Sequence, residues 1–405
     1  MSVRRVFLIV ALPVLFLAVL GGMIFSIVYS QSSPRDDLVT PHQVISIPLS
    51  TEPSLLAWSA DGKYIAAGTG YSPGMPVSGP AKVFLIEVGK QAVAATVDTA
   101  ARIDALAFSP DGKWLAAATG VVNDSADLLV LTVPDFTLKT KLKSRGEVLD
   151  DKRRWPTSFV DIAWAPDSKT LHAIDGFLAQ PPQFRRWTPP DFGERPAITN
   201  KVATQTGDAI AVAPNGRSLC YVESRVGGSP GVLHLFDLAT GAQAISIENV
   251  PHGRFRAAFT ADGKSVGVFS GIEVMPIVSD IFDSNGKNGG KHQTMSWWDV
   301  ATGQPTTPTN PRFAVQPAAQ AESRYFSIAP DSRIWAHSLN LRQPGKDGRL
   351  DEDGRYVALT RTDTTKGWRW RFGNTPSLAF SPDSRKLAGT LKTQGGWTVA
   401  IWTVS

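Results

Sequence analysis

The chain has a single cysteine, Cys220, among its 405 residues. One thiol cannot form a disulfide within the chain, and no cysteine cluster is present to bind zinc. Cys220 lies in the alternating stretch SLCYVES, which indicates a small buried apolar residue. Neither a disulfide framework nor a cysteine-ligated metal is therefore expected.

Catalytic signatures are also lacking. The six histidines show no spacing typical of metal ligands, and no Gly-x-Ser-x-Gly nucleophile motif occurs. The sialidase Asp-box needs a residue between Asp and Gly, which the stretch SPDGKW does not have. No catalytic residue and no cofactor is predicted.

Strong charge of one sign is absent as well. The net charge is +5, and Lys and Arg are scattered in ones and twos, unlike the clustered basic surface of a nucleic-acid-binding protein. Hydrophobic residues make up 42% of the chain and charged residues 19%, while Gly (35) and Pro (29) are frequent. This composition is typical of a globular fold with many turns.

One long apolar run is present at the N-terminus. Residues 6–29 contain no charged side chain, and a helix of that length would cross a bilayer core of about 30 Å. Arg4 and Arg5 precede the run, and Asp36 and Asp37 follow it. The positive-inside rule then predicts cytoplasmic residues 1–5, a transmembrane signal anchor at 6–29, a linker at 30–41 and an extracytoplasmic domain at 42–405.

A cleaved signal peptide is the alternative interpretation of the same run. Its apolar region would be shorter, at about 7–15 residues, and no small-x-small cleavage site follows. An uncleaved anchor is therefore favoured.

One pattern occurs seven times in the remaining chain. An alternating apolar run leads into a turn such as Ser-Pro-Asp-Gly-Lys, and a second alternating run follows, as in LAFSPDGKWLAAATG at residues 106–120. Two such runs around an Asp-Gly turn predict a β-hairpin, in which glycine adopts the positive φ that the reversal needs. The structural turn residues are Asp61, Asp111, Asp167, Asn215, Asp262, Asp331 and Asp383.

The turns recur roughly every 50 residues, which leaves room for two further strands in each interval. In the first interval these are KVFLIEV and QAVAATV, at residues 82–88 and 91–97. Four strands per repeat at this period predict the blade of a β-propeller. The predicted fold class is therefore all-β, a seven-bladed β-propeller of four-stranded blades over residues 42–405, preceded by one transmembrane helix.

The two ends of this domain are expected to meet. Only two more strands fit after Asp383, so the seventh blade lacks an outer strand. The run HQVISIPL at residues 42–49 has no partner of its own and is expected to complete that blade, which leaves no long edge open. A ring of six or eight blades is the alternative, should one copy be irregular.

The stretches FSPDGKWLAAATG and LAFSPDSRKLAGT resemble the bacterial WD-repeat group, including the repeats of the Tol-system periplasmic propeller. WWDVATGQ and LFDLATGAQ are similar to the end of the WD-type strand and its turn. The resemblance covers residues 42–405 and implies a membrane-anchored WD-repeat-like β-propeller. The Gly-His pair of that family is missing, and the aromatic-Asp ending is clear only at Phe236-Asp237 and Trp298-Asp299.

The expected connectivity gives the domain two different faces. The Asp turns and the Ala-Thr-Gly turns lie on one face, the turn face, and the linker must arrive there, so this face is expected to look toward the membrane. The other connections lie on the distal face, where the longest runs from residue 272 to 294. Because loops on a rigid frame carry function, the binding-face candidates are Ile281, Phe282, Asp283, Asn285, Lys287, Lys291 and His292.

A weak calcium candidate lies in a second long distal connection, residues 341–355. Asp347, Asp351 and Asp353 are followed by Gly354, but Arg349 breaks the Asp-x-Asp-x-Asp-Gly spacing. Calcium needs about six to eight oxygen ligands, so a solvated acidic turn is the favoured interpretation and no metal site is predicted.

Basic and aromatic residues occur together in three runs, RRW at 153–155, RRW at 185–187 and WRWRF at 368–372. The favoured interpretation is the outer strand of a blade whose aromatic side chains pack on the next blade. The functional alternative is a site for an anionic or sugar ligand, which would use stacking and bidentate arginine contacts.

Together these features predict a non-enzymatic propeller on the periplasmic side of the bacterial inner membrane. It would bind a protein or peptide partner of the cell envelope on its distal face, and no nucleic acid. The competing prediction is a propeller enzyme, namely a hydrolase, a lyase or a sugar-acting enzyme, with a site assembled from several blades at the mouth of the central channel.

Overall fold

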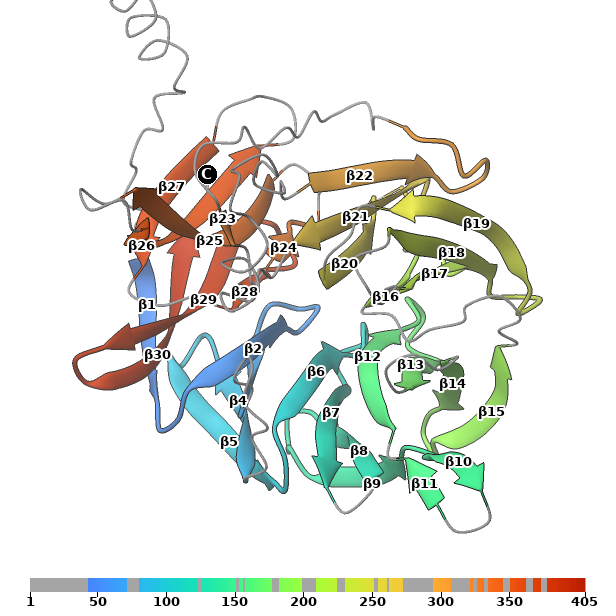
Figure 1. Ribbon diagram of the computed structural model, residues 1–405. Helices are drawn as coiled ribbons and strands as arrows, with labels where there is room; N and C mark the ends of the chain where they lie inside the picture. The colour runs from blue at the N-terminus through green and yellow to red at the C-terminus, as the bar shows by residue number, and fades with distance from the viewer. Residues whose placement is uncertain are drawn as a thin grey trace, which may run out of the picture.

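Every regular element that the structure describes is a β-strand (Figure 1). The computed structural model describes residues 43–70, 80–122, 125–150, 153–155, 157–176, 182–198, 209–223, 230–250, 254–260, 262–271, 294–306, 321–322, 326–330, 334–344, 350–361, 367–372 and 377–404. Within these ranges no helix is long and apolar enough to cross a bilayer. The expected anchor at 6–29 and linker at 30–41 lie outside them.

Consecutive strands pair antiparallel into sheets, which we name A to G in chain order. Sheet A has β2 (Pro53–Trp58), β3 (Tyr64–Thr69), β4 (Ala81–Glu87) and β5 (Ala92–Thr99), and sheet B has β6 (Ile103–Phe108), β7 (Trp114–Val122), β8 (Ser125–Thr132) and β9 (Leu138–Lys143). Sheet C has β12 (Ser158–Trp164), β13 (Leu171–Gly176), β14 (Gln183–Thr188) and β15 (Gly193–Ile198), and sheet D has β16 (Ala209–Val212), β17 (Ser218–Glu223), β18 (Gly231–Asp237) and β19 (Gln243–Val250). These four sheets have the four strands that the repeat predicts.

Two later sheets depart from four simple strands. Sheet E has β20 (Arg254–Phe259), β21 (Ser265–Gly271) and β22 (Thr294–Asp299), and beyond β22 a single bridge joins Trp298 to Pro305. Sheet F has β25 (Ile334–Pro344), β26 (Leu350–Arg361) and β27 (Gly367–Phe372), while two short strands, β23 (Ala321–Glu322) and β24 (Phe326–Ile328), both pair with β25. Within the described residues, sheet E therefore has three strands and one bridge, and sheet F has four strands, β24 to β27, with β23 in addition.

Sheet G joins the two ends of the described chain. It has β28 (Leu378–Phe380), β29 (Lys386–Thr393), β30 (Gly396–Thr403) and β1 (Gln43–Leu49), and β1 pairs with β30 so that Ile47 lies opposite Val399. The first strand of each sheet contacts the first strand of its neighbour for the pairs β2 and β6, β6 and β12, β12 and β16, β16 and β20, β24 and β28, and β28 and β2. Figure 1 shows these strands facing a common centre.

One pair of strands belongs to none of these sheets. Between sheets B and C, β10 (Glu147–Asp150) and β11 (Arg153–Trp155) form a separate two-stranded hairpin. The run at residues 153–155 therefore lies in an inserted hairpin, and the expectation that it is the outer strand of a blade is wrong.

The connection expected at residues 341–355 is mostly strand. Strands β25 and β26 stay paired as far as Pro344 and Leu350, after a register shift near Leu341. Gly and Asp residues disfavour strands only weakly, and cross-strand pairing overrides that preference here. This part of sheet F is a long hairpin rather than a long loop.

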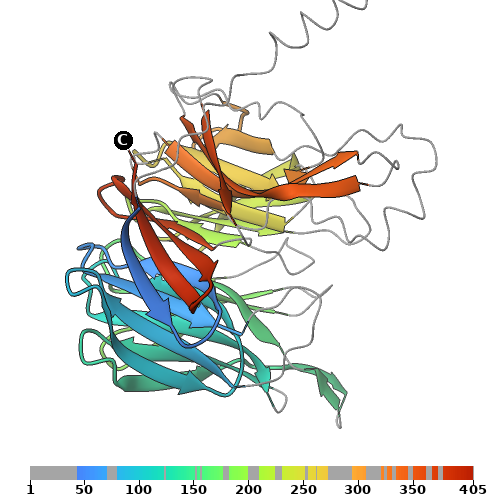
Figure 2. The same ribbon diagram turned by 90° about the vertical axis from the view of Figure 1, so that its left-hand side faces the viewer.

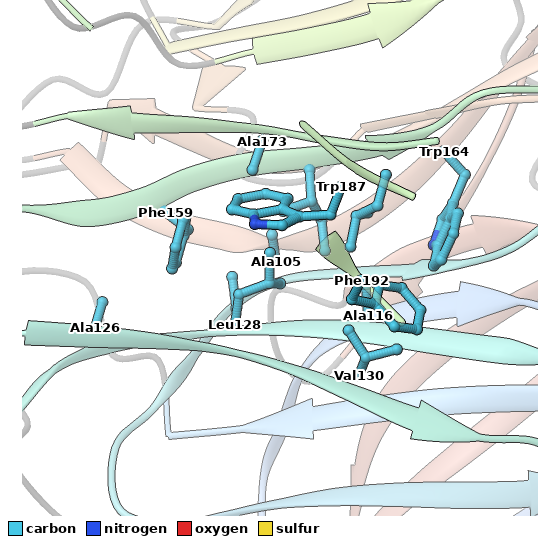
Figure 3. Close-up of a cluster of buried hydrophobic side chains, with 13 residues drawn as sticks. Ala105, Ala116, Ala126, Leu128, Val130, Phe159, Trp164, Ala173, Trp187 and Phe192 are labelled. Carbon is cyan, nitrogen blue, oxygen red and sulfur yellow. The ribbon is translucent and has the colours of Figure 1, made fainter. Parts of the chain in front are cut away.

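The apolar core lies between neighbouring sheets. Successive side chains of a strand point to opposite faces, so in β8 Leu129 and Leu131 pack toward sheet A, and Leu128 and Val130 pack toward sheet C. Figure 3 shows the second cluster, where Phe159 and Trp187 of sheet C meet Leu128 of sheet B. Sheets A, B, C, D and G are thus buried on both faces, and neighbouring sheets stabilise each other.

The repeated Asp turn is held by its own side chains. In the first copy Ser59 Oγ donates to Asp61 Oδ1 at 2.7 Å, and Asp61 Oδ1 also accepts from the backbone N–H of Lys63 at 3.0 Å. The same backbone contact occurs at Asp111, Asp167, Asn215, Asp262 and Asp383, whereas Asp331 lies outside the described residues. These residues are therefore engaged in shaping the turn.

Indole groups join neighbouring sheets next to these turns. Trp58 Nε1 donates to the carbonyl oxygen of Ala379 at 2.9 Å, and Trp164 Nε1 donates to that of Ala107 at 3.0 Å. Both tryptophans end the first strand of their sheet, where β6 and β28 end in Phe108 and Phe380. The last residue of the first strand can therefore be tryptophan or phenylalanine, but only tryptophan donates a hydrogen bond to the neighbouring sheet.

Replacing Trp58 with phenylalanine is expected to lower the free energy of unfolding by about 1 kcal/mol, because the ring is kept and one intersheet hydrogen bond is lost. Denaturation in urea would measure the change. The half-buried Trp397 of β30 serves as the matched control, and Trp397→Phe is expected to cost less. Equal losses in both variants would contradict a role for the Trp58 bond.

Candidate functional site

Two adjacent sheets have buried ionisable pairs at the same structural position. In sheet C the pair is Asp175 of β13 and Arg185 of β14, and Arg185 lies opposite the residue two positions before Asp175, namely Ala173. In sheet D the pair is Glu223 of β17 and His234 of β18, and His234 likewise lies opposite the residue two positions before Glu223, namely Tyr221. The equivalent pairs are Thr69 and Phe84 in sheet A, and Thr119 and Leu129 in sheet B. Compared with sheets A and B, the ionisable pairs are thus particular to sheets C and D, where they lie near the strand ends opposite to the Asp turns.

Arg185 is held by carboxylates of the chain itself. Its Nε and Nη2 donate to the two carboxylate oxygens of Glu194 at 2.8 and 3.0 Å, and its Nη1 donates to Asp175 Oδ2 at 2.9 Å. The guanidinium lies 4.8 Å from the ring centroid of Trp187 and 5.7 Å from that of Phe159. Stacking and bidentate contacts therefore occur in the run 185–187, but they are made within the protein.

The electrostatics of this group agree with its geometry. Burial alone would lower the pKa of Arg185, but its hydrogen bonds with Glu194 and Asp175 outweigh burial and raise that pKa. The hydrogen bond from Arg185 in turn holds the pKa of Glu194 below its usual range. Both partners are therefore charged at neutral pH.

The same carboxylates fix the base of the β10–β11 hairpin. Asp175 Oδ2 accepts from the backbone N–H of Arg145 at 2.9 Å, and the Arg145 side chain donates to Glu194 at 2.8 Å. Arg185 Nη1 also donates to the carbonyl oxygen of Lys143 at 2.6 Å. The end of β9 and the segment between β9 and β10 are thus bound at three points to sheet C.

Thr157 closes the base of this hairpin from the other side. Its Oγ1 donates to Asp175 Oδ1 at 2.5 Å and accepts from the backbone N–H of Gly146 at 3.0 Å. Gly146 adopts a φ of 65°, a conformation that glycine tolerates best. Both ends of the inserted hairpin therefore meet at the buried Asp175 carboxylate.

The pair in sheet D belongs to a chain of hydrogen bonds. His234 Nε2 lies 2.9 Å from Glu223 Oε2, and His234 Nδ1 lies 3.0 Å from Ser246 Oγ. Tyr221 stacks on the imidazole with a centroid distance of 5.9 Å, and Gln243 Nε2 contacts both Ser246 Oγ and His234 Nδ1. His234 and Glu223 are buried, whereas Ser246 is exposed on β19.

Cys220 is fully buried, as its alternating context indicates. Burial raises the pKa of its thiol to about 12, so the thiolate nucleophile is negligible at neutral pH. Among the residues that the structure describes, no group of three or more His, Cys, Asp and Glu is placed to hold a metal ion.

The binding-face candidates Ile281, Phe282, Asp283, Asn285, Lys287, Lys291 and His292 lie outside the described residues. Asp347 does too, whereas Asp351 and Asp353 lie in β26, with Asp351 opposite Gln343 of β25. The third basic-aromatic run, 368–372, lies in the outermost strand β27 of sheet F, in the place that the sequence suggests. The run 185–187 lies in β14, the third strand of sheet C, so the expectation of an outer strand is wrong there.

Sequence reasoning missed both buried pairs. A usable signal was present, because Asp175 and Glu223 lie at or near the end of strands β13 and β17, at the position that Thr69 and Thr119 occupy in β3 and β7. A carboxylate at the end of an otherwise apolar strand indicates a partner on a neighbouring strand. The partner itself depends on strand register, which the repeat does not specify.

Comparison with known proteins identifies the architecture. No family model and no curated protein matches the sequence. Hydrazine synthase of Kuenenia stuttgartiensis aligns with a TM-score of 0.63 at 14% identity, over 91% of this chain and 99% of that chain. The β-propeller domain of Cps50 (Swd1) from Myceliophteria thermophila aligns with a TM-score of 0.59 at 13% identity, over 90% of this chain and 100% of that chain. The fold is a β-propeller. At these identities the likeness shows the fold alone, and the four-stranded sheets A to D have the form of its blades.

Proposed function

We propose that this β-propeller is a non-catalytic scaffold that binds a protein or peptide partner in the bacterial cell envelope. In this proposal the blades A to G close into a WD-repeat-like ring of seven through the pairing of β1 with β30. Residues 6–29 anchor the ring in the inner membrane, with the propeller on the periplasmic side and its distal face turned outward.

The observation that carries the proposal is the fixed base of the β10–β11 hairpin. The hairpin interrupts the passage from blade B to blade C, whereas β5 and β6 are joined by a short connection from Thr99 to Ile103. Buried charges of Asp175 and Arg185 are used to hold it. A rigid frame that presents inserted segments in a set orientation favours recognition, because less ordering is needed on binding.

The partner can be tested by crosslinking in intact membranes. The full chain and a variant in which a short Gly-Ser linker replaces residues 272–293 would be purified under identical conditions. We expect the full chain to retain one envelope protein that the variant loses. If both proteins retain the same partner, the partner binds a surface other than this connection. If neither protein retains a specific partner, the scaffold function is wrong.

The membrane topology needs a separate test. The chain is expected to remain in the membrane after carbonate extraction, and its propeller to be digested by protease added to spheroplasts. A chain released by carbonate would contradict the anchor, and a chain protected in spheroplasts but digested after lysis would contradict the periplasmic orientation.

A further inference from the structure

The outer strand of blade B has an unusual charge pattern. Lys139, Lys141 and Lys143 are exposed at alternate positions of β9, and Thr140 and Leu142 between them are half-buried. Lys141 and Lys143 both contact the same carboxylate, with Nζ to oxygen distances of 3.2 and 3.3 Å to Asp127. One carboxylate cannot neutralise two lysines, so positive charge remains along the strand.

The edge of β9 is also open in the part of the chain that the structure describes. β9 is the last strand of the sheet β6-β7-β8-β9, and its far side pairs with no described strand. Leu138, at the start of β9, is 51% exposed and is the most exposed large apolar side chain in the described residues. An open strand with an apolar residue at one end is a template for strand addition.

An alternative explanation is that the lysines of β9 only protect an edge strand against aggregation. The other outer strands argue against that reading here, because β5, β15, β19 and β1 contain no lysine. If lysine were this propeller's general device for protecting edges, those strands would carry it too. Arginines occur at alternate positions of the outer strand β27, but a row of lysines is particular to β9 among these strands.

The inserted hairpin continues directly from this strand. Residues 144–146 join β9 to β10, and the buried Arg185 group holds them in place. Figure 2 shows the hairpin extending beyond the body of the propeller. The open edge thus runs up to a projecting arm whose base is fixed.

We propose that the open edge of β9 is a docking surface for an extended acidic segment of a partner protein, which adds to blade B as a fifth strand beside the β10–β11 hairpin. The positive charge of the lysines in β9 favours an acidic partner strand. A strand with acidic residues at every second position would place them beside the row of lysines. Its intervening side chains would face Thr140 and Leu142.

This inference rests on the proposed scaffold function but uses a different surface from residues 272–293. The two can therefore fail separately. Loss of binding on replacing 272–293 concerns the distal connection, and loss on changing the lysines of β9 concerns the edge of blade B.

The test uses the full chain in detergent micelles and a fluorescein-labelled decapeptide of alternating Glu and Val, with binding followed by fluorescence anisotropy. The test variant carries Lys139→Gln, Lys141→Gln and Lys143→Gln. The matched control carries Lys63→Gln, Lys113→Gln and Lys169→Gln, three exposed turn lysines whose loss changes the net charge equally. A Glu-Val decapeptide in which every backbone amide nitrogen is methylated has the same charge but lacks the backbone donors that strand pairing needs.

We expect the Glu-Val peptide to bind about tenfold more weakly to the test variant, since three exposed ion pairs are removed, and to bind the control variant like the natural chain. If the Glu-Val peptide bound equally more weakly to both variants, net charge alone would explain the change in affinity and the proposal would be wrong. Equal binding of the N-methylated peptide would exclude strand addition. If the test variant loses affinity only for phosphatidylglycerol vesicles, the surface faces lipid and the proposal is wrong.

Discussion

Replacing Arg185 with methionine is expected to lower the free energy of unfolding by about 3–5 kcal/mol. Methionine fills much of the space between Trp187 and Phe159, so the loss is mainly electrostatic. Asp175 would remain buried without its cation, and Glu194 would lose a bidentate partner. Breaking a buried ion pair from one side is costly because the remaining charge can reach neither water nor a counter-ion.

The neighbouring Arg186 provides a matched control. It lies on the opposite face of β14, and its Nε donates to the exposed carbonyl oxygen of Pro196. Arg186→Met is therefore expected to cost less than about 1 kcal/mol. Urea denaturation compares the two variants, and a loss for Arg185→Met as small as that of the control would contradict the buried network.

A local measurement separates the network from general stability. Arg185 also holds the carbonyl oxygen of Lys143 at the base of the hairpin. In native buffer, trypsin is expected to cut the hairpin sequence DKRR at 151–154 faster in Arg185→Met than in the natural chain. An unchanged cleavage rate would mean that the hairpin is fixed by other contacts.

The hairpin turns could be predicted because their contacts span few residues. Asp61 bonds to Ser59 and Lys63, two positions away on either side, so the whole motif is visible in the sequence. Where serine replaces the turn glycine, as at Ser168 and Ser384, φ is still 62° and 60°. The rest of the motif therefore imposes the conformation even on a residue that tolerates it less well.

The β10–β11 hairpin and the buried pairs could not be predicted in the same way. Asp175 meets Arg185 only because β13 and β14 pair in one particular register, and a shift by one residue would turn the arginine to the other face. The run RRW at 153–155 has the same three residues as the run at 185–187, which lies in strand β14 of sheet C. Only its pairing with residues 147–150 shows that it belongs to an insertion.

The free energy of unfolding is expected to depend on pH through His172. This side chain is buried in β13, its Nδ1 has no hydrogen-bond partner among the described residues, and Arg186 lies opposite it. Burial, followed by the charge of Arg186, lowers its pKa from 6.5 to about 4. As the pH falls, His172 therefore binds a proton near pH 6.5 in the unfolded chain, but only near pH 4 in the folded chain.

The sign of the effect follows from that difference. The stabilising contribution is complete above pH 6.5 and is lost as the pH falls toward 4, by about 3 kcal/mol over the interval. His172→Ala should flatten this part of the stability curve. Alanine suits the position, because Ala66, Ala116 and Ala388 occupy it in blades A, B and G.

A cavity control separates titration from packing. Leu171→Ala also removes a buried side chain from β13 but leaves His172 in place. Both variants are expected to be less stable than the natural chain at pH 7, by about 2–4 kcal/mol, but only His172→Ala should change the slope between pH 6.5 and 4. If both variants keep the natural slope, another group carries the pH dependence. If His172→Ala alone flattens it, a single neutral histidine between two blades limits how far this propeller tolerates acid.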